Sequence, residues 1–226
     1  MRSIRSLIRS NRGFLAFLLL FGLVRTAVAD YNVIPSGSMR PNLLEGDVVL
    51  VNRLAYNLKL PLTDIVLARL GEPRHGDIVT FFSPKDRVRL IKRVVGLPGD
   101  IVTMKNKQLL INGRQVEYAL IGVVSEDAGD GRRWPSVRVR EELGDHPYPI
   151  QWLDGTGNAA SFGPIVIPPD RYLVLGDNRD NSFDSRFLGL IPRDLLIGRA
   201  SRVLVSAAIT DNWMPRIDRF GKSLYD

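Results

Sequence analysis

Two serines and one lysine are the residues of this 226-residue chain best placed to do chemistry. Ser36 and Ser38 stand two positions apart in the segment 34–41, where two prolines and a glycine favour a rigid, non-helical backbone. Lys92 lies inside the apolar run 90–95. A serine activated by a lysine is a known variant of the Ser-His-Asp hydrolase site. Taken singly, these features also fit an ordinary loop and a solvent-facing strand cation.

Other nucleophile and base pairs have less support. The chain has no cysteine, which excludes thiol nucleophiles, thiolate metal sites and disulfides. His75 precedes a Gly-Asp turn and His146 lies in a loop-rich stretch, so neither has a recognisable catalytic setting. A Ser-His-Asp triad is therefore poorly supported, and the Ser-Lys pair is the better hydrolase interpretation.

The segment 176–186 concentrates polar, loop-forming residues directly after an expected strand. It could be a polar surface loop, and Asp177, Asp180 and Asp184 could supply oxygen ligands to calcium. The arginines that alternate with these acids favour internal salt bridges instead. We therefore expect a structural scaffold here, with no metal and no other cofactor.

The net charge of +7 does not indicate a nucleic-acid partner. Residues 1–29 contain no acid and five arginines: Arg2, Arg5, Arg9, Arg12 and Arg25. These five belong to the chain's 31 basic residues, so 26 remain in the rest of the chain against 24 acidic ones. Basic charge beside an apolar segment is typical of a segment that a membrane or translocon recognises. A nucleic-acid-binding protein would instead carry a basic stripe on its folded domain.

The apolar run 13–24 has two interpretations. Its short length and the Ala27-x-Ala29 pattern fit a cleavable signal peptide. Alternatively, residues 13–29 form a short uncleaved transmembrane anchor whose flanking arginines keep the N-terminus cytoplasmic.

From Tyr31 onward the pattern is mainly β, with short apolar runs bounded by turn residues. The expected strands are 48–52, 77–82, 90–95, 101–105, 108–111, 171–175 and 198–205. Turns are expected at 97–100 and at the Asn112-Gly113 dipeptide. Residues 57–74 show weak helical spacing, which suggests a short helix or an ordered excursion. Residues from about 116 to 167 are expected to form an insertion of loops and a few short strands.

Four segments in order resemble the motifs of the type I signal peptidases, the membrane-bound proteases that remove signal peptides. Residues 35–41 match the nucleophile motif, 76–79 the following strand motif, 92–100 the general-base motif, and 176–186 the last motif almost residue for residue. The resemblance runs from Ile34 to about Val205, and the insertion is its least similar part.

The resemblance implies a role for each site residue. Ser38 attacks the scissile carbonyl, and Lys92 takes its proton as a neutral amine, which requires a buried, apolar setting. Ser182 orients that amine, while the Ser38 N–H and the Ser36 hydroxyl form the oxyanion hole. Scaffold roles fall to Asp177, Arg179, Asp184 and Arg186, with Asp184 and Arg186 as the expected pair. Shallow −1 and −3 pockets are lined by Ile34, Pro35, Met39, Leu43, Val49, Leu90 and Ile91.

The resemblance also implies an organisation: a cytoplasmic segment 1–12, an anchor 13–29, and an exported peptidase domain 30–226 on the outer, periplasmic side of the bacterial cytoplasmic membrane. The expected partners are the lipid bilayer and the signal peptides of preproteins, which are cleaved after Ala-x-Ala. The enzyme is expected to be a monomer. Two departures stand out, Arg89-Leu90 before the lysine and a single short anchor. The alternatives are a relative dedicated to one pilus or conjugation substrate, a self-cleaving repressor, and a membrane-tethered β module with a dead site.

Overall fold

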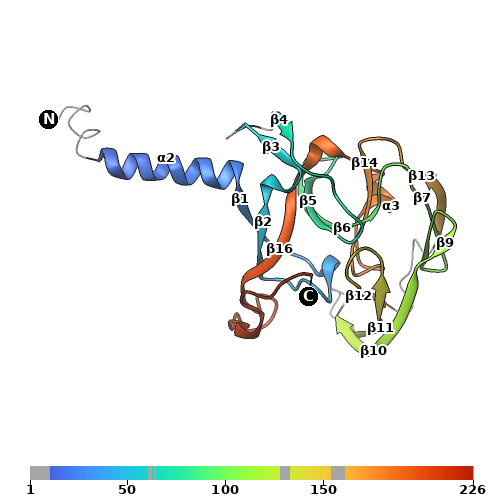
Figure 1. Ribbon diagram of the computed structural model, residues 1–226. Coiled ribbons are helices and arrows are strands. Elements are labelled where there is room, and N and C mark those ends of the chain that lie inside the picture. Colours follow the sequence, from blue (N-terminus) through green and yellow to red (C-terminus); the bar gives the residue numbers. More distant parts are fainter. Residues whose placement is uncertain (1–10, 61–62, 64, 128–132, 154–160, 226) are drawn as a thin grey trace.

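The computed structural model describes residues 11–60, 63, 65–127, 133–153 and 161–225. Helix α2 (Arg12–Ala27) is the first element among the described residues and projects away from a β-rich domain (Figure 1). The expected cytoplasmic segment 1–12 lies outside the described residues except for its last two positions. Everything that positions the candidate site belongs to the β-rich domain.

The main sheet has seven strands in the spatial order β1, β2, β16, β5, β6, β14, β15. Their bounds are β1 (Ala29–Val33), β2 (Asp47–Asn52), β16 (Leu196–Ser206), β5 (Ile78–Phe82), β6 (Arg89–Gly96), β14 (Arg171–Leu175) and β15 (Ile191–Pro192). All its strand pairs are antiparallel. Side chains on β2 alternate between buried and half-buried, as expected for a strand with one face on the core.

Three smaller antiparallel sheets surround this sheet. The insertion sheet contains β10 (Glu117–Asp127), β11 (Arg133–Glu142) and β12 (Tyr148–Leu153). A second contains β13 (Phe162–Val166), β7 (Ile101–Lys105), β8 (Gln108–Ile111) and β9 (Arg114–Gln115), and a third pairs β3 (Asn57–Lys59) with β4 (Val66–Arg69). The short helices are η1 (Gly37–Met39), η2 (Arg53–Ala55), α3 (Ser185–Leu188), η3 (Arg193–Leu195) and η4 (Ile217–Arg219).

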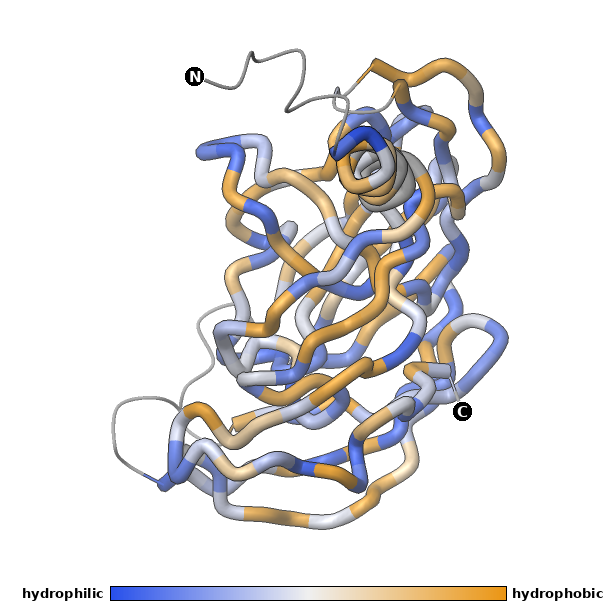
Figure 2. Tube along the Cα trace, turned by 90° about the vertical axis from the view of Figure 1, so that its left-hand side faces the viewer, coloured by the Kyte–Doolittle hydropathy of each residue, from blue (hydrophilic) through white to orange (hydrophobic). Residues whose placement is uncertain are grey.

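Apolar side chains gather into three buried clusters within the domain. One joins the insertion sheet to β7 and β8 through residues such as Leu109 and Ile150. A second lies beneath the segment that carries Ser38 and includes Met39 and Ile91. The third packs β5 and β14 against α3 and β15. Figure 2 shows apolar segments running through the strands of the domain, with α2 viewed close to its axis.

Most expected strands are present. Strands β7, β8 and β14 have the predicted bounds, and β2, β5, β6 and β16 differ from theirs by one or two residues at an end. The Asn112-Gly113 turn joins β8 to β9 with positive φ angles of 54° and 79°, which suits a tight hairpin turn.

Two expectations about the connecting segments are wrong. Residues 57–74 contain the β3–β4 hairpin, so the helical interpretation is wrong and the ordered excursion is the one that fits, because tertiary pairing outweighs a weak apolar spacing. The insertion contains strands of 11, 10 and 6 residues where loops and short strands were expected. Their polar side chains conceal the strand pattern, since several of them pair inside the protein.

The expected anchor 13–29 coincides with α2 and the first residue of β1. Among the helices that the structure describes, none combines the length and the apolar character needed to cross a membrane. Ala29 already pairs with Asn52 of β2, so the β-rich domain begins directly after α2.

Candidate active site

The segment that carries Ser38 is a tight turn held by buried neighbours. Ser36 is extended, and η1 then turns the chain, closed by a hydrogen bond from the Arg40 N–H to the Gly37 carbonyl of 3.1 Å. Met39 is fully buried and anchors the turn in the core. Gly37 is tightly surrounded, because an added Cβ would lie 2.9 Å from Glu45 Oε1 and would push that side chain aside. The sequence thus fixes the backbone around both hydroxyls.

Lys92 reaches this turn from β6, the strand beside β5. Its Nζ donates to Ser38 Oγ at 2.8 Å and to its neighbour's carbonyl, Ile91 O, at 2.9 Å. The lysine is only 3% exposed. The predicted nucleophile and base are therefore in direct contact, although 54 residues separate them in the chain.

Burial changes the acidity of this amine. Desolvation disfavours the charged ammonium and lowers the pKa of Lys92 to about 8, while the carboxylates of Asp184 and Asp177 oppose the shift. At pH 7 such a pKa leaves roughly one amine in ten neutral and able to accept a proton. The arrangement can therefore perform general-base chemistry on the Ser38 hydroxyl.

The last predicted segment, 176–186, lies against both the turn that carries Ser38 and the strand that carries Lys92. Asn178 donates its N–H to Ser38 O and its side-chain amide to Gly37 O, both at 3.1 Å. Asp177 accepts two hydrogen bonds of 2.7 Å from Arg93, the residue that follows Lys92 on β6. One short loop thus binds both the turn that carries Ser38 and the strand that carries Lys92, and fixes their relative position.

Of the four predicted scaffold residues, Asp177, Arg179 and Asp184 are buried and Arg186 is partly buried, and all four are engaged in ion pairs. Asp184 accepts from Arg186 at 2.7 and 2.8 Å, as expected, and also from the Gly176 N–H. Asp177 pairs with Arg93, and Arg179 pairs with Glu141 of the insertion sheet at 2.6 Å. The proposed calcium ligands are thereby neutralised by basic side chains, since Asp180 in turn contacts Lys107. The described residues contain no acid and histidine cluster suited to a metal ion.

One predicted contact is absent. Ser182 Oγ has no hydrogen-bond partner among the described residues, so it does not orient Lys92 in this structure. The amine is already directed by Ser38 Oγ and Ile91 O. Ser182 nevertheless lies close to the site, because a Cβ on Gly176 would meet both Ser182 Oγ and Ser38 O within 2.5 Å.

A cavity of about 540 Å³ opens beside the dyad. Ser36 and Ser38, the predicted oxyanion residues, line it together with Pro35, Gly37, Arg40, Glu45, Asn178, Asn181, Phe183 and Thr210. Of the seven residues predicted to form substrate pockets, only Pro35 belongs to this lining. Ile34, Met39, Leu43, Val49 and Ile91 are packed in the cluster beneath the turn, and Leu90 packs against the neighbouring cluster.

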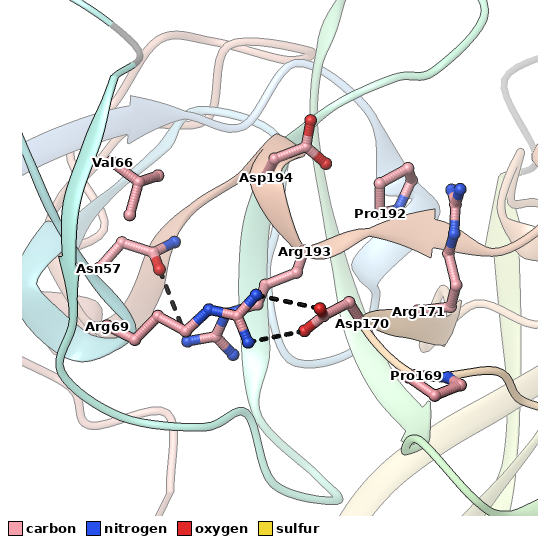
Figure 3. Close-up of a pocket in the computed structure, with 9 residues that line it drawn as sticks. All are labelled: Asn57, Val66, Arg69, Pro169, Asp170, Arg171, Pro192, Arg193 and Asp194. Carbon is pink, nitrogen blue, oxygen red and sulfur yellow. Dashed lines mark hydrogen bonds and ion pairs between the residues drawn. The ribbon is translucent and has the colours of Figure 1, made fainter.

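A second cavity, of about 390 Å³, lies between the β3–β4 hairpin and β15. Figure 3 shows an Arg69–Asp170 ion pair on its wall, with both hydrogen bonds at 2.9 Å. None of its lining residues belongs to the predicted site.

Several residues at the site escape prediction from sequence. Strand alternation alone suggests a solvated cation at Arg93, yet this residue is 1% exposed. Glu141 lies in the insertion, where no motif marks it. His75 contacts Asp100 at 2.8 Å and takes no part in the Ser38–Lys92 contact. Only the pairing of distant strands reveals these partners.

Sequence comparison with known proteins gives a consistent result. The family model described as signal peptidase, peptidase S26, matches residues 7–205. Signal peptidase I of Pseudomonas fluorescens is 35% identical over 212 residues, covering 88% of this chain and 73% of that protein. Signal peptidase I of Pseudomonas aeruginosa is also 35% identical, with the same coverage. A crystal structure of a signal peptidase I from Enterococcus faecalis shares 27% identity and covers 57% of this chain and 96% of that one, with a TM-score of 0.34.

A match over most of the chain, with relatives at this level of identity, is sufficient to assign the family. This chain belongs to the signal peptidases of peptidase family S26, which are serine peptidases.

Proposed function

We propose that this protein cleaves signal peptides from exported preproteins, with Ser38 as nucleophile and Lys92 as general base. The observation that carries the proposal is the 2.8 Å contact between Lys92 Nζ and Ser38 Oγ in a buried setting. The neutral amine takes the Ser38 proton as Oγ attacks the scissile carbonyl. The resulting ammonium then gives that proton to the leaving amine, which frees the mature N-terminus.

The acyl-enzyme left on Ser38 is hydrolysed by the same groups. Neutral Lys92 takes a proton from water, the hydroxide adds to the ester carbonyl, and the proton returns to Ser38 as the signal peptide departs. Both steps pass through an oxyanion, for which the Ser36 hydroxyl and the Ser38 N–H are the donors that the family motif implies. Both residues line the cavity beside the dyad, which supports this assignment.

We further propose that cleavage follows small-x-small sequences. Met39, Leu43 and Ile91 fill the region beneath the nucleophile turn and are almost completely buried. Little space remains there for a substrate side chain, so small residues at −1 and −3 fit best. An extended substrate would add to the sheet as a strand.

The N-terminal segment is proposed to tether the enzyme to the bilayer. Phe14, Phe17 and Phe21 on α2 are each more than half exposed, and α2 stands clear of the domain (Figure 1). Arginines flank this apolar stretch, as expected for a segment that meets anionic lipid on the cytoplasmic side. Such a tether would keep Ser38 near the membrane where signal peptides emerge.

Replacing either member of the dyad should abolish cleavage. We expect Ser38→Ala and Lys92→Ala each to lower kcat/KM for an Ala-x-Ala preprotein by at least about 10³-fold, because a nucleophile and its base act as a unit. Purified detergent-solubilised protein and gel analysis of the product suffice for the measurement. Ser125→Ala and Lys105→Ala, at exposed strand positions, are the matched controls. Near-normal cleavage by either dyad variant would show that the assignment is wrong.

The activity should rise with pH as Lys92 loses its proton. Because the neutral amine is the active form, log kcat/KM should increase with unit slope at low pH and level off above a midpoint near pH 8. A His75→Gln variant should keep the same midpoint. A midpoint near the ordinary histidine pKa, or its loss in that variant, would identify a different base.

Removing the buried amine should stabilise the fold while destroying activity. The unfolded lysine titrates at 10.5 and the folded one at about 8, so folding at neutral pH carries a cost of about 3 kcal/mol. This cost is complete below pH 8 and disappears as pH rises to 10.5. Lys92→Met should therefore raise the free energy of unfolding at pH 7 by up to about 3 kcal/mol, and by little above pH 10.5. Urea unfolding at both pH values measures it, and equal gains at both would contradict it.

Membrane attachment should depend on the exposed face of α2. Changing Phe14, Phe17 and Phe21 together to Ser should reduce co-flotation with phosphatidylethanolamine and phosphatidylglycerol vesicles. The matched control changes three exposed apolar residues of β10, Leu120, Ile121 and Val123, to Ser. Equal flotation of the α2 variant and the unaltered protein would place the membrane contact elsewhere.

A further inference from the structure

Glu141, on β11 of the insertion sheet, is a fully buried carboxylate with three donors. It accepts hydrogen bonds from Tyr118 Oη at 2.9 Å, Tyr148 Oη at 2.7 Å and Arg179 Nη2 at 2.6 Å. Burial opposes its charge, but the Arg179 guanidinium and the two hydroxyls outweigh this and keep the pKa of Glu141 below its usual range. The carboxylate is therefore a charged, fully satisfied anchor for Arg179.

Arg179 connects this anchor to the loop 176–186. Its Nε donates to Gly176 O at 3.2 Å, and its own N–H donates to Gln151 O of β12 at 3.0 Å. The Gln151 N–H in turn donates to Asp177 O at 2.9 Å. The insertion sheet thus binds the start of the loop 176–186 through one ion pair and two backbone hydrogen bonds.

That part of the loop is in contact with the nucleophile turn. Asn178 donates to Ser38 O and Gly37 O, and a Cβ on Gly176 would lie 2.5 Å from Ser38 O. With so little free space on this side, a shift of Gly176 toward Ser38 would displace the Ser38 backbone. The hydrogen bond between Ser38 and Lys92 depends on that position.

The insertion sheet also touches the lysine strand. The Arg93 guanidinium lies 3.7 Å above the centre of the Tyr148 ring and binds Asp177 with two hydrogen bonds. Tyr148 is itself held by Glu141. The same carboxylate is therefore linked to the loop through Arg179 and to β6 through Tyr148.

We propose that Glu141 is a positioning residue of the active site, which fixes Ser38 relative to Lys92 through Arg179 and Gly176. The insertion sheet then contributes directly to the geometry of the active site. This inference rests on the proposed Ser38–Lys92 chemistry.

The first test compares Glu141→Gln with Glu142→Gln, an identical change at the next, exposed position of β11. The neutral amide of Glu141→Gln cannot balance the charge of Arg179, so the loop should shift. Because small misplacements of reacting groups are costly, kcat should fall on the order of 10- to 100-fold, with KM changed by less than about twofold. Assays are run well below the unfolding midpoint of each variant. Glu142→Gln should match the unaltered protein.

A second variant separates positioning from stability and is informative even if Glu141→Gln folds poorly. Glu141→Met combined with Arg179→Met replaces the buried pair by apolar groups of similar size, which commonly restores stability. Gly176 O still lacks its Arg179 donor, so kcat should stay low in this stable protein. If kcat recovers together with the unfolding midpoint, Glu141 is only structural and the proposal is overturned.

Ser38→Ala, assayed in parallel, separates the two levels of inference. If Ser38→Ala is inactive and Glu141→Gln is fully active, the positioning role is refuted while the dyad stands. If Ser38→Ala retains activity, the dyad itself fails, and the positioning role fails with it.

Discussion

The hydrogen bond between the buried Lys92 amine and Ser38 Oγ is the constraint on which the rest of the site depends. An amine can act as a base near neutral pH only if its surroundings disfavour the ammonium, and at 3% exposure this lysine meets that condition. The same burial opposes folding, because the unfolded lysine is fully protonated. The surrounding structure must therefore hold an unfavourable group in one place without giving it a strong charged partner.

The ion pairs around the dyad meet this requirement because their carboxylates are bound by arginines and not by the lysine. Arg93 takes both oxygens of Asp177, and Arg186 takes both oxygens of Asp184. The two carboxylates that act on the pKa of Lys92 are thus neutralised by arginines, so they oppose its shift without reversing it. Buried pairs of this kind add little stability, but they fix geometry tightly when every donor and acceptor is engaged.

Much of the fold could be predicted from the chain because local signals agreed with the tertiary structure. Strands β7, β8 and β14 follow apolar runs bounded by turn residues, and Asn112-Gly113 marks a hairpin by its backbone preference alone. The β3–β4 hairpin and the long strands of the insertion escaped prediction. In both places the pairing of distant segments determines the structure, and the residue pattern is weak or polar.

For the site, the sequence by itself determined the chemical groups, whereas the 3-10 helix η1 that carries Ser38 stands where a non-helical backbone was expected. Ser36, Ser38 and Lys92 are recognisable by type, order and flanking residues, and the family motifs narrow their roles. Only the tertiary structure decided which groups meet. In it, Lys92 donates a hydrogen bond to Ser38 and receives no hydrogen bond from Ser182, and Glu141 of the insertion pairs with Arg179. Residue type and order fix what a group can do, whereas contacts between strands far apart in the chain depend on pairing and burial, which no local pattern encodes.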